Sequence, residues 1–147
     1  MGNLKLTSSA FSDGSEIPRE YGYKHGNEEP PLSSSGIPEG TKSLALIMDD
    51  PDAMGAVGKI WVHWVAWNID PTKTELELAK STEGMTDFGE VGYGGPAPPD
   101  KMHTYVFKLY ALDSELDLPG KSTKADVEKA MEGHIIEQTQ LTGTYAP

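Results

Sequence analysis

Carboxylate, imidazole and phenol side chains lie at the ends of three apolar segments of this sequence. The first group follows the apolar run at 43–48, where Asp50 and Asp52 stand two residues apart. Residues at this spacing face the same way in an extended chain, and Pro51 favours an extended conformation for Asp50. Taken alone, the segment also fits a solvated turn.

The second group is a histidine inside a segment rich in tryptophan and valine, Trp61-Val62-His63-Trp64. Strand alternation predicts that Trp61, His63 and Val65 share one face and that the even-numbered residues share the other. Burial disfavours the charged imidazolium unless an anion or a carboxylate lies near it. The alternative is a core histidine whose ring bonds a backbone carbonyl.

The third group is His103 with Tyr105, which share a face at the start of the third apolar segment and follow a Gly- and Pro-rich loop at 92–99. Gly94 and Gly95 would let the backbone come close to a ligand, because no Cβ intervenes. The N–H groups of such a loop can line a concavity that binds an oxyanion. The alternative is a proline-rich surface loop.

Together these groups predict one pocket built from Asp50, His63, His103, Tyr105 and the backbone of Gly95. Imidazole and phenol groups can donate to phosphate oxygens, and a carboxylate can orient an imidazole through its second nitrogen. The set contains no Lys or Arg. Anion binding would therefore rest on histidine protonation, and we expect it to weaken as the pH rises through the histidine pKa values.

The same residues allow an alternative function. Asp50, His63 and His103 form a set of two histidines and one carboxylate, which can hold a divalent metal with open positions. This would make the protein a metal-dependent enzyme, a hydrolase or an oxygenase. The three residues come from distant segments and lack a compact motif such as H-E-x-x-H, so the sequence favours a binding module without a metal, a cofactor or catalytic residues.

Length and charge narrow the classes of function. The 147 residues suit a single domain over 1–147. A net charge of −11 opposes binding to nucleic acid, and the absence of cysteine excludes disulfides and thiolate chemistry. The sequence has neither a long apolar run nor a secretory signal at its start, so we expect no integral membrane segment and a cytoplasmic location.

The spacing of 16 Gly and 11 Pro favours short strands joined by turns. The pattern predicts a first strand, three strong central strands and a closing edge strand, at 4–7, 43–48, 60–69, 105–112 and 141–145. One helix is expected after Thr123, because Thr123 and Asp126 together resemble a capping box. Its buried stripe would contain Val127, Met131 and Ile135. The sequence therefore predicts a mainly β protein.

An ordered combination of segments resembles the phosphatidylethanolamine-binding protein family, also called the Raf-kinase-inhibitor-like family, and is most similar to its bacterial and archaeal branch. The resemblance rests on Asp50-Pro51-Asp52-Ala53, Trp61-Val62-His63-Trp64, the loop at 92–99 and His103-Thr104-Tyr105-Val106-Phe107, and is extended by 109–113 and 132–134. It implies a β-sandwich with Greek-key character and one or two peripheral helices.

The resemblance also implies an anion pocket. Asp50, His63, His103 and Tyr105 match the pocket residues of the family. Its motifs further place Gly95 and Pro96 at the rim, Trp61 beside the pocket and Asp52 in a supporting position. Neither enzymatic activity nor a cofactor is implied.

Family members bind phosphoryl head groups and other small anions, and some inhibit kinases or serine proteases. The resemblance therefore implies a small phosphate-like anion or a phospholipid head group as ligand. A kinase, a serine protease and a second copy of the chain, in a homodimer, are hypotheses for the protein partner. Met54 stands where a proline commonly follows the Asp-Pro-Asp-Ala segment, which changes the expected shape of the rim.

Overall fold

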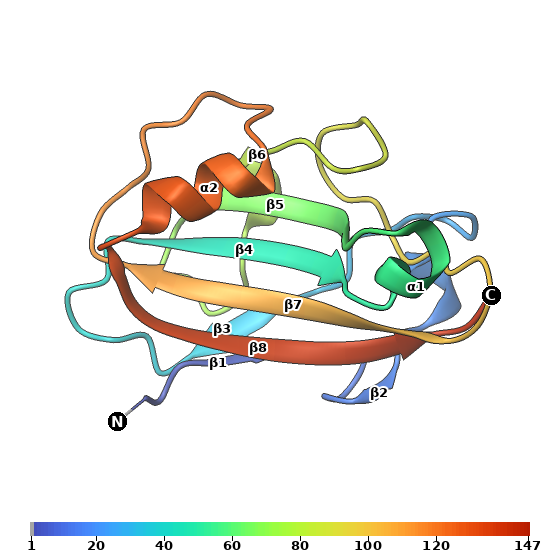
Figure 1. Ribbon diagram of the computed structural model, residues 1–147. Helices are drawn as coiled ribbons and strands as arrows, with labels where there is room; N and C mark the ends of the chain where they lie inside the picture. Colours follow the sequence, from blue (N-terminus) through green and yellow to red (C-terminus); the bar gives the residue numbers. More distant parts are fainter. Residues whose placement is uncertain (1) are drawn as a thin grey trace.

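The computed structural model describes residues 2–147, which form two β-sheets and two short α-helices (Figure 1). The strands are β1 (Lys5–Thr7), β2 (Ser15–Glu16), β3 (Ser33–Ser35), β4 (Ser43–Asp50), β5 (Trp61–Ile69), β6 (Thr82–Glu83), β7 (His103–Leu112) and β8 (Ile135–Tyr145). The helices are α1 (Ala53–Val57) and α2 (Lys124–Met131), with 3-10 turns η1 (Arg19–Tyr21) and η2 (Leu78–Lys80). Among the residues described, no helix has the length and apolar character needed to cross a membrane.

The larger sheet has six strands in the order β2-β8-β7-β4-β5-β6, and β1 pairs with β3 in a separate two-stranded sheet. Helix α2 covers one face of the larger sheet (Figure 1). The small sheet contributes Leu6 to the core on the opposite face. These layers confirm the predicted mainly β sandwich with peripheral helices.

Strand β4 is buried along its whole length because it lies between two cores. Leu46 and Met48 belong to the core shared with β1, whereas Ala45 and Ile47 belong to the core beneath α2. A strand that is covered on both faces gives a continuous apolar run rather than an alternating one. This double burial explains why the segment at 43–48 has the continuous apolar run that is typical of a buried strand.

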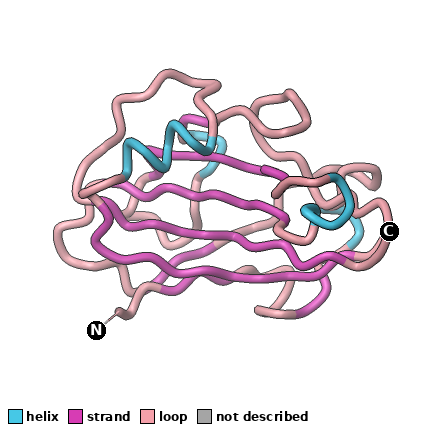
Figure 2. The backbone as a smooth tube through the Cα atoms, viewed as in Figure 1, coloured by secondary structure: helices cyan, strands magenta, loops and turns pink. Residues whose placement is uncertain are grey.

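The antiparallel order of the central strands positions the chemical groups. Strand β4 pairs antiparallel with both β5 and β7. The end of β4, which carries Asp50, therefore lies beside the starts of the other two strands, which carry His63 and His103. Helix α1 and the loops before β7 lie at this same end of the sheet (Figure 2).

The end of α2 differs from the prediction. The capping box is present, since Thr123 Oγ1 accepts from the Asp126 N–H and Asp126 Oδ2 accepts from the Thr123 N–H. The helix, however, ends at Met131, and Gly133 adopts a φ of 80°, a left-handed conformation that favours glycine after a helix. Ile135 consequently belongs to β8 and is 43% exposed.

Strand β8 is also longer than the predicted segment at 141–145, because it begins at Ile135 and pairs with the whole of β7. It is not the outermost strand along its full length, since β2 pairs in parallel with Gly143 and Thr144. The five-residue helix α1 has no counterpart among the predicted elements.

We expect Met131→Ala to lower the free energy of unfolding by about 2–5 kcal/mol, because Met131 is buried against the sheet. Ile135→Ala should change it by only about 0.5 kcal/mol, because the side chain is largely exposed. Urea unfolding followed by circular dichroism measures both. Equal losses would show that the helical stripe continues to Ile135, as the sequence pattern predicted.

Candidate anion-binding site

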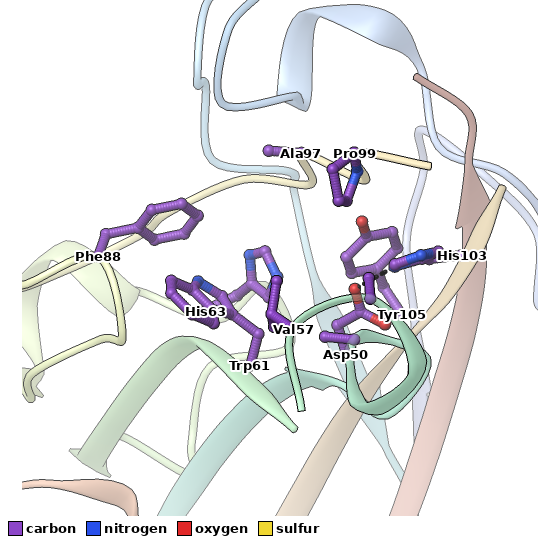
Figure 3. A pocket seen from close by; sticks show the side chains of 11 residues that line it. Asp50, Val57, Trp61, His63, Phe88, Ala97, Pro99, His103 and Tyr105 are labelled. Carbon is purple, nitrogen blue, oxygen red and sulfur yellow. Dashed lines mark hydrogen bonds and ion pairs between the residues drawn. The ribbon is translucent and has the colours of Figure 1, made fainter. Parts of the chain in front are cut away.

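A cavity of about 230 Å³ opens at the end of the sheet where β4 finishes and β5 and β7 begin. Figure 3 shows Trp61 and His63 on one side of it and Asp50, His103 and Tyr105 on the other. The residues that line it are Asp50, Ala53, Ala56, Val57, Trp61, His63, Phe88, Ala97, Pro99, His103 and Tyr105. The structure thus brings together five of the residues singled out in the sequence.

A β-bulge turns His63 into this cavity. Met48 pairs with Trp64 while Asp49 pairs with Val62, so that His63 is an extra residue without a direct partner on β4. Such a bulge redirects a side chain and interrupts the alternation of faces. The prediction that Val65 shares a face with Trp61 and His63 is therefore wrong, because Val65 packs in the core beneath α2.

The ring of His63 is buried and held at one nitrogen. Nδ1 donates to the carbonyl oxygen of Gly94 at 2.7 Å, and the ring stands edge-to-face against Phe88 and Tyr105. Burial lowers the pKa of His63, outweighing the hydrogen bond to Gly94 and the charge of Asp50, which raise it. His63 is therefore neutral near pH 7, with the proton on Nδ1 and a lone pair on Nε2.

His103 is in the opposite situation, because both of its nitrogens meet carboxylates. Nδ1 lies 2.6 Å from Asp50 Oδ2, and Nε2 lies 2.7 Å from Asp100 Oδ1. Burial lowers the pKa of His103, but the hydrogen bonds to Asp50 and Asp100 outweigh it and the net pKa is raised. An imidazolium that donates from both nitrogens suits this geometry.

Two polar atoms of the site are buried without a hydrogen-bond partner in the described structure, Asp50 Oδ1 and the hydroxyl of Tyr105. Burial raises the pKa of Tyr105, and the charge and proximity of the Asp50 carboxylate raise it further, whereas the nearby Ala97 N–H lowers it; the net shift is upward, so this side chain stays a neutral phenol. In Figure 3 its hydroxyl points toward the loop that carries Pro99. A carboxylate oxygen that can only accept and a phenol that can donate are thus both left for a ligand.

The glycine-rich loop serves a different purpose from the one its sequence suggested. The Gly95 N–H donates to Asn27 Oδ1 at 2.7 Å, and a Cβ at this position would overlap the carbonyl oxygen of Tyr21. A Cβ at Gly94 would overlap the ring of Phe88. These glycines therefore allow the loop to pack against the segment around Tyr21 and against Phe88, and the loop then carries Ala97 and Pro99 to the cavity.

The remaining predicted residues lie next to the cavity without lining it. Pro96 accepts from the Tyr23 N–H through its carbonyl oxygen, at 2.9 Å. Asp52 Oδ2 accepts from the Thr104 N–H at 2.8 Å and so links the turn before α1 to the start of β7. These bonds hold in place two of the segments that surround the cavity.

Sequence reasoning missed several residues of the site. Phe88 stacks on Tyr23, with 4.2 Å between ring centroids, and closes the cavity beside His63. Helix α1 contributes Ala53, Ala56 and Val57. Asp100 stands three residues before His103, and this spacing in a turn before a strand was the available signal for a carboxylate partner.

The alternative of a metal site built from two histidines and a carboxylate does not fit this geometry. Both nitrogens of His103 face carboxylates, so the ring offers no lone pair to a metal. Within residues 2–147, no group of three His, Cys, Asp or Glu side chains is arranged to hold a metal ion.

Comparison with known proteins identifies the family. The sequence pattern of the family described as phosphatidylethanolamine-binding protein matches residues 7–146. A UPF0098 protein from Methanothermobacter thermautotrophicus is 45% identical, over 97% of this chain and 98% of its own length. The chain therefore belongs to the phosphatidylethanolamine-binding protein family.

Solved structures agree with this assignment. CT736 of Chlamydia trachomatis, described as a phosphatidylethanolamine-binding protein homolog, matches with a TM-score of 0.91 and 39% identity, over 99% of this chain and 98% of its own. YbcL of E. coli, described as a new member of the mammalian family, matches with a TM-score of 0.88 and 31% identity, covering 98% of each chain. A carboxypeptidase Y inhibitor solved with its cognate proteinase shares the fold at 18% identity and a TM-score of 0.58, covering 95% of this chain and 81% of its own.

The two buried histidines should titrate in opposite directions from their ordinary pKa of about 6.5. We expect His103 to deprotonate above this value and His63 below it. NMR of the ring protons in the folded chain measures both, and the urea-unfolded chain serves as the reference. A lower pKa for His103 than for His63 would contradict the described arrangement.

These two pKa shifts make the free energy of unfolding depend on pH in opposite ways. The contribution of His103 is complete below its unfolded pKa and is lost as the pH rises through its raised folded pKa. The contribution of His63 is complete above its unfolded pKa and is lost as the pH falls through its lowered folded pKa.

Gly95→Ala should lower the free energy of unfolding by about 1–3 kcal/mol, because its Cβ would overlap the Tyr21 backbone. Gly120→Ala is the matched control, since nothing lies within 4 Å of the added Cβ. That variant should be neutral or more stable by up to about 1 kcal/mol. Thermal unfolding compares the two, and equal effects would mean that the loop is not packed as described.

Proposed function

We propose that this member of the phosphatidylethanolamine-binding protein family binds a small phosphate-like anion in the cavity at the ends of β4, β5 and β7. The ligand would be inorganic phosphate or the phosphoryl group of a small molecule or lipid head group. Asp50, His63 and Tyr105 would contact it, and His103 would hold Asp50 in place. Trp61 would form one wall.

The observation that carries this proposal is the pair of unsatisfied polar atoms in the cavity. Buried polar groups in folded proteins are nearly always hydrogen-bonded, so an unpartnered group calls for an explanation. Among the described residues Ser34 Oγ and Trp67 Nε1 are also buried without a partner, but they lie apart from the cavity, whereas Asp50 Oδ1 and the Tyr105 hydroxyl belong to residues that line it together. A ligand with oxygens and acidic hydrogens would satisfy both.

The size of the cavity also supports a small ligand group. Sites for drug-sized molecules typically measure about 300–1,000 Å³, whereas this cavity measures about 230 Å³. Apart from the polar groups named above, alanine, valine, proline and aromatic side chains line it. Such a lining suits a compact polar group with an apolar or extended remainder outside.

A binding role is favoured over a catalytic one by the state of the histidines. His103 cannot act as a free base while both of its nitrogens donate to carboxylates. His63 has one free nitrogen, but its other nitrogen and its ring are fixed by Gly94, Phe88 and Tyr105. These contacts support a site that holds a group in one orientation over one that transfers protons.

Protein partners form a separate part of the proposal. Met54, Val57, Ile60 and Met102 are exposed apolar side chains that lie within or beside segments lining the cavity. A kinase or serine protease that is inhibited through this surface stays a prediction, as do a homodimer and a cytoplasmic location. The fold shared with the carboxypeptidase Y inhibitor is compatible with an inhibitor role.

Calorimetric titration of the full chain with inorganic phosphate at pH 6 tests the proposal. We expect saturable binding at one site per chain. Tyr105→Phe should weaken it by about 10- to 100-fold, because one hydrogen bond to a charged group is lost. Tyr110→Phe is the control, since Tyr110 packs in the core beneath α2, on the other face of the sheet.

Ethylammonium chloride, titrated in the same way, is the contrasting probe, because a carboxylate among aromatic rings also suits a cation. Binding of ethylammonium without binding of phosphate would overturn the proposal. If Tyr105→Phe and Tyr110→Phe changed the affinity for phosphate equally, phosphate would not be bound in the cavity.

A further inference from the structure

The cavity presents an unusual set of charges for an anion site. Its walls contain no Lys or Arg. The charged groups in its walls are the Asp50 carboxylate and the His103 imidazolium, and Asp100, which does not line the cavity, adds a second carboxylate on the far nitrogen of His103; the three together leave one negative charge. A fully ionised anion would therefore enter a site whose own charge repels it.

The other titratable groups around Asp50 do not reverse this balance. His63 and Tyr105 are neutral, as described above, and both face the cavity. Asp52 adds a further carboxylate nearby, engaged with the Thr104 N–H. Asp49, the neighbour of Asp50 in the chain, binds Lys108 and Lys124, so these two cations are already paired with a carboxylate.

The hydrogen-bonding capacity of the polar atoms that face the cavity also disfavours a fully ionised anion. Asp50 Oδ1 can only accept, and His63 Nε2 accepts when Nδ1 donates to Gly94. Only the Tyr105 hydroxyl among these three atoms can donate. An anion whose oxygens all lack hydrogen would leave Asp50 Oδ1 desolvated, unpartnered and next to a like charge, which is costly in a buried site.

We infer that the cavity selects oxyanions that still carry an acidic hydrogen, namely inorganic phosphate and phosphate monoesters in their protonated, singly charged forms. Asp50 Oδ1 accepts from the acidic P–OH group, and Tyr105 donates to an oxygen without hydrogen. In dihydrogen phosphate the second P–OH donates to His63 Nε2. This inference rests on the proposed function and adds the chemical class of the ligand.

The inference separates two sources of a phosphoryl group. A phosphate monoester keeps an acidic hydrogen below its second pKa, which is about 6. A phosphodiester, the linkage of a phospholipid head group, has no P–OH to offer when ionised. Sulfate has the same tetrahedral shape as phosphate and is fully ionised near neutral pH. We expect neither the ionised phosphodiester nor sulfate to bind well, because each would leave the charge of Asp50 Oδ1 buried without a hydrogen-bond donor. An unpaired charge of this kind is a known source of specificity against a wrong ligand.

The test is calorimetric titration of the full chain at pH 6 with phosphate, methyl phosphate, dimethyl phosphate and sulfate. Phosphate and methyl phosphate should bind, and sulfate and dimethyl phosphate should bind at least about 10-fold more weakly. Sulfate that binds as tightly as phosphate would overturn the inference and leave the proposed function standing. If none of the four probes bound, the proposed function itself would fail.

Asp50→Asn provides the decisive variant. Its amide oxygen can replace Oδ2 as the acceptor for His103, while its NH₂ group replaces Oδ1 and donates into the cavity. We expect the ratio of phosphate to sulfate affinity to fall by at least about 10-fold, through weaker phosphate binding and stronger sulfate binding.

Asp100→Asn is the matched control. Asp100 is the other carboxylate on His103, so this variant removes the same charge but leaves Asp50 Oδ1 in the cavity. The phosphate preference should be retained. Equal loss of preference in both variants would assign the selection to net charge and contradict the role of Asp50 Oδ1. Should Asp50→Asn fail to fold, the four probes on the unaltered chain still decide the matter.

Discussion

The pairing of Asp50 with His103 is the constraint on which the site depends. The two side chains come from different strands, are both buried, and meet at 2.6 Å. Removing the partner of a buried carboxylate strongly destabilises a folded protein, because an uncompensated charge is left in the interior. The pair uses one oxygen of Asp50 and fixes the carboxylate, and the second oxygen is then presented to the cavity without a partner. Asp100 completes the arrangement by occupying the other nitrogen of His103.

Strand β4 makes this pairing possible and also connects the site to the rest of the fold. The side chains of its last two residues, Asp49 and Asp50, lie on opposite faces of the sheet. Asp49 is buried and binds Lys124 of α2 at 2.8 Å, whereas Asp50 faces the cavity. One end of one strand therefore anchors the covering helix and supplies the acceptor of the candidate site. Because β4 is central and buried on both faces, this end is held by pairing on both sides.

The sequence allowed the central part of this arrangement to be predicted, because the relevant signals are local. Apolar runs indicated β4, β5 and β7, and the chemistry of Asp50, His63 and His103 at their ends indicated one shared pocket. The antiparallel pairing of the three strands, which the sequence did not predict, is what brings these ends together. The bulge at His63 was not predictable from alternation, since it is defined only by the register with β4. The contact of Gly95 with Asn27 joins distant segments, so the glycine was assigned to a ligand instead of to a packing role. The end of α2 was misplaced because an apolar residue of β8, Ile135, happens to continue the helical spacing.

The most direct measurement is a crystal structure of the chain grown with phosphate at pH 6. The account predicts one phosphate in the cavity, with one oxygen about 2.5–2.7 Å from Asp50 Oδ1, the short distance typical of a hydroxyl that donates to a carboxylate. A second oxygen should accept from the Tyr105 hydroxyl. A phosphate bound elsewhere, or one whose oxygens all turn away from Asp50, would contradict the account.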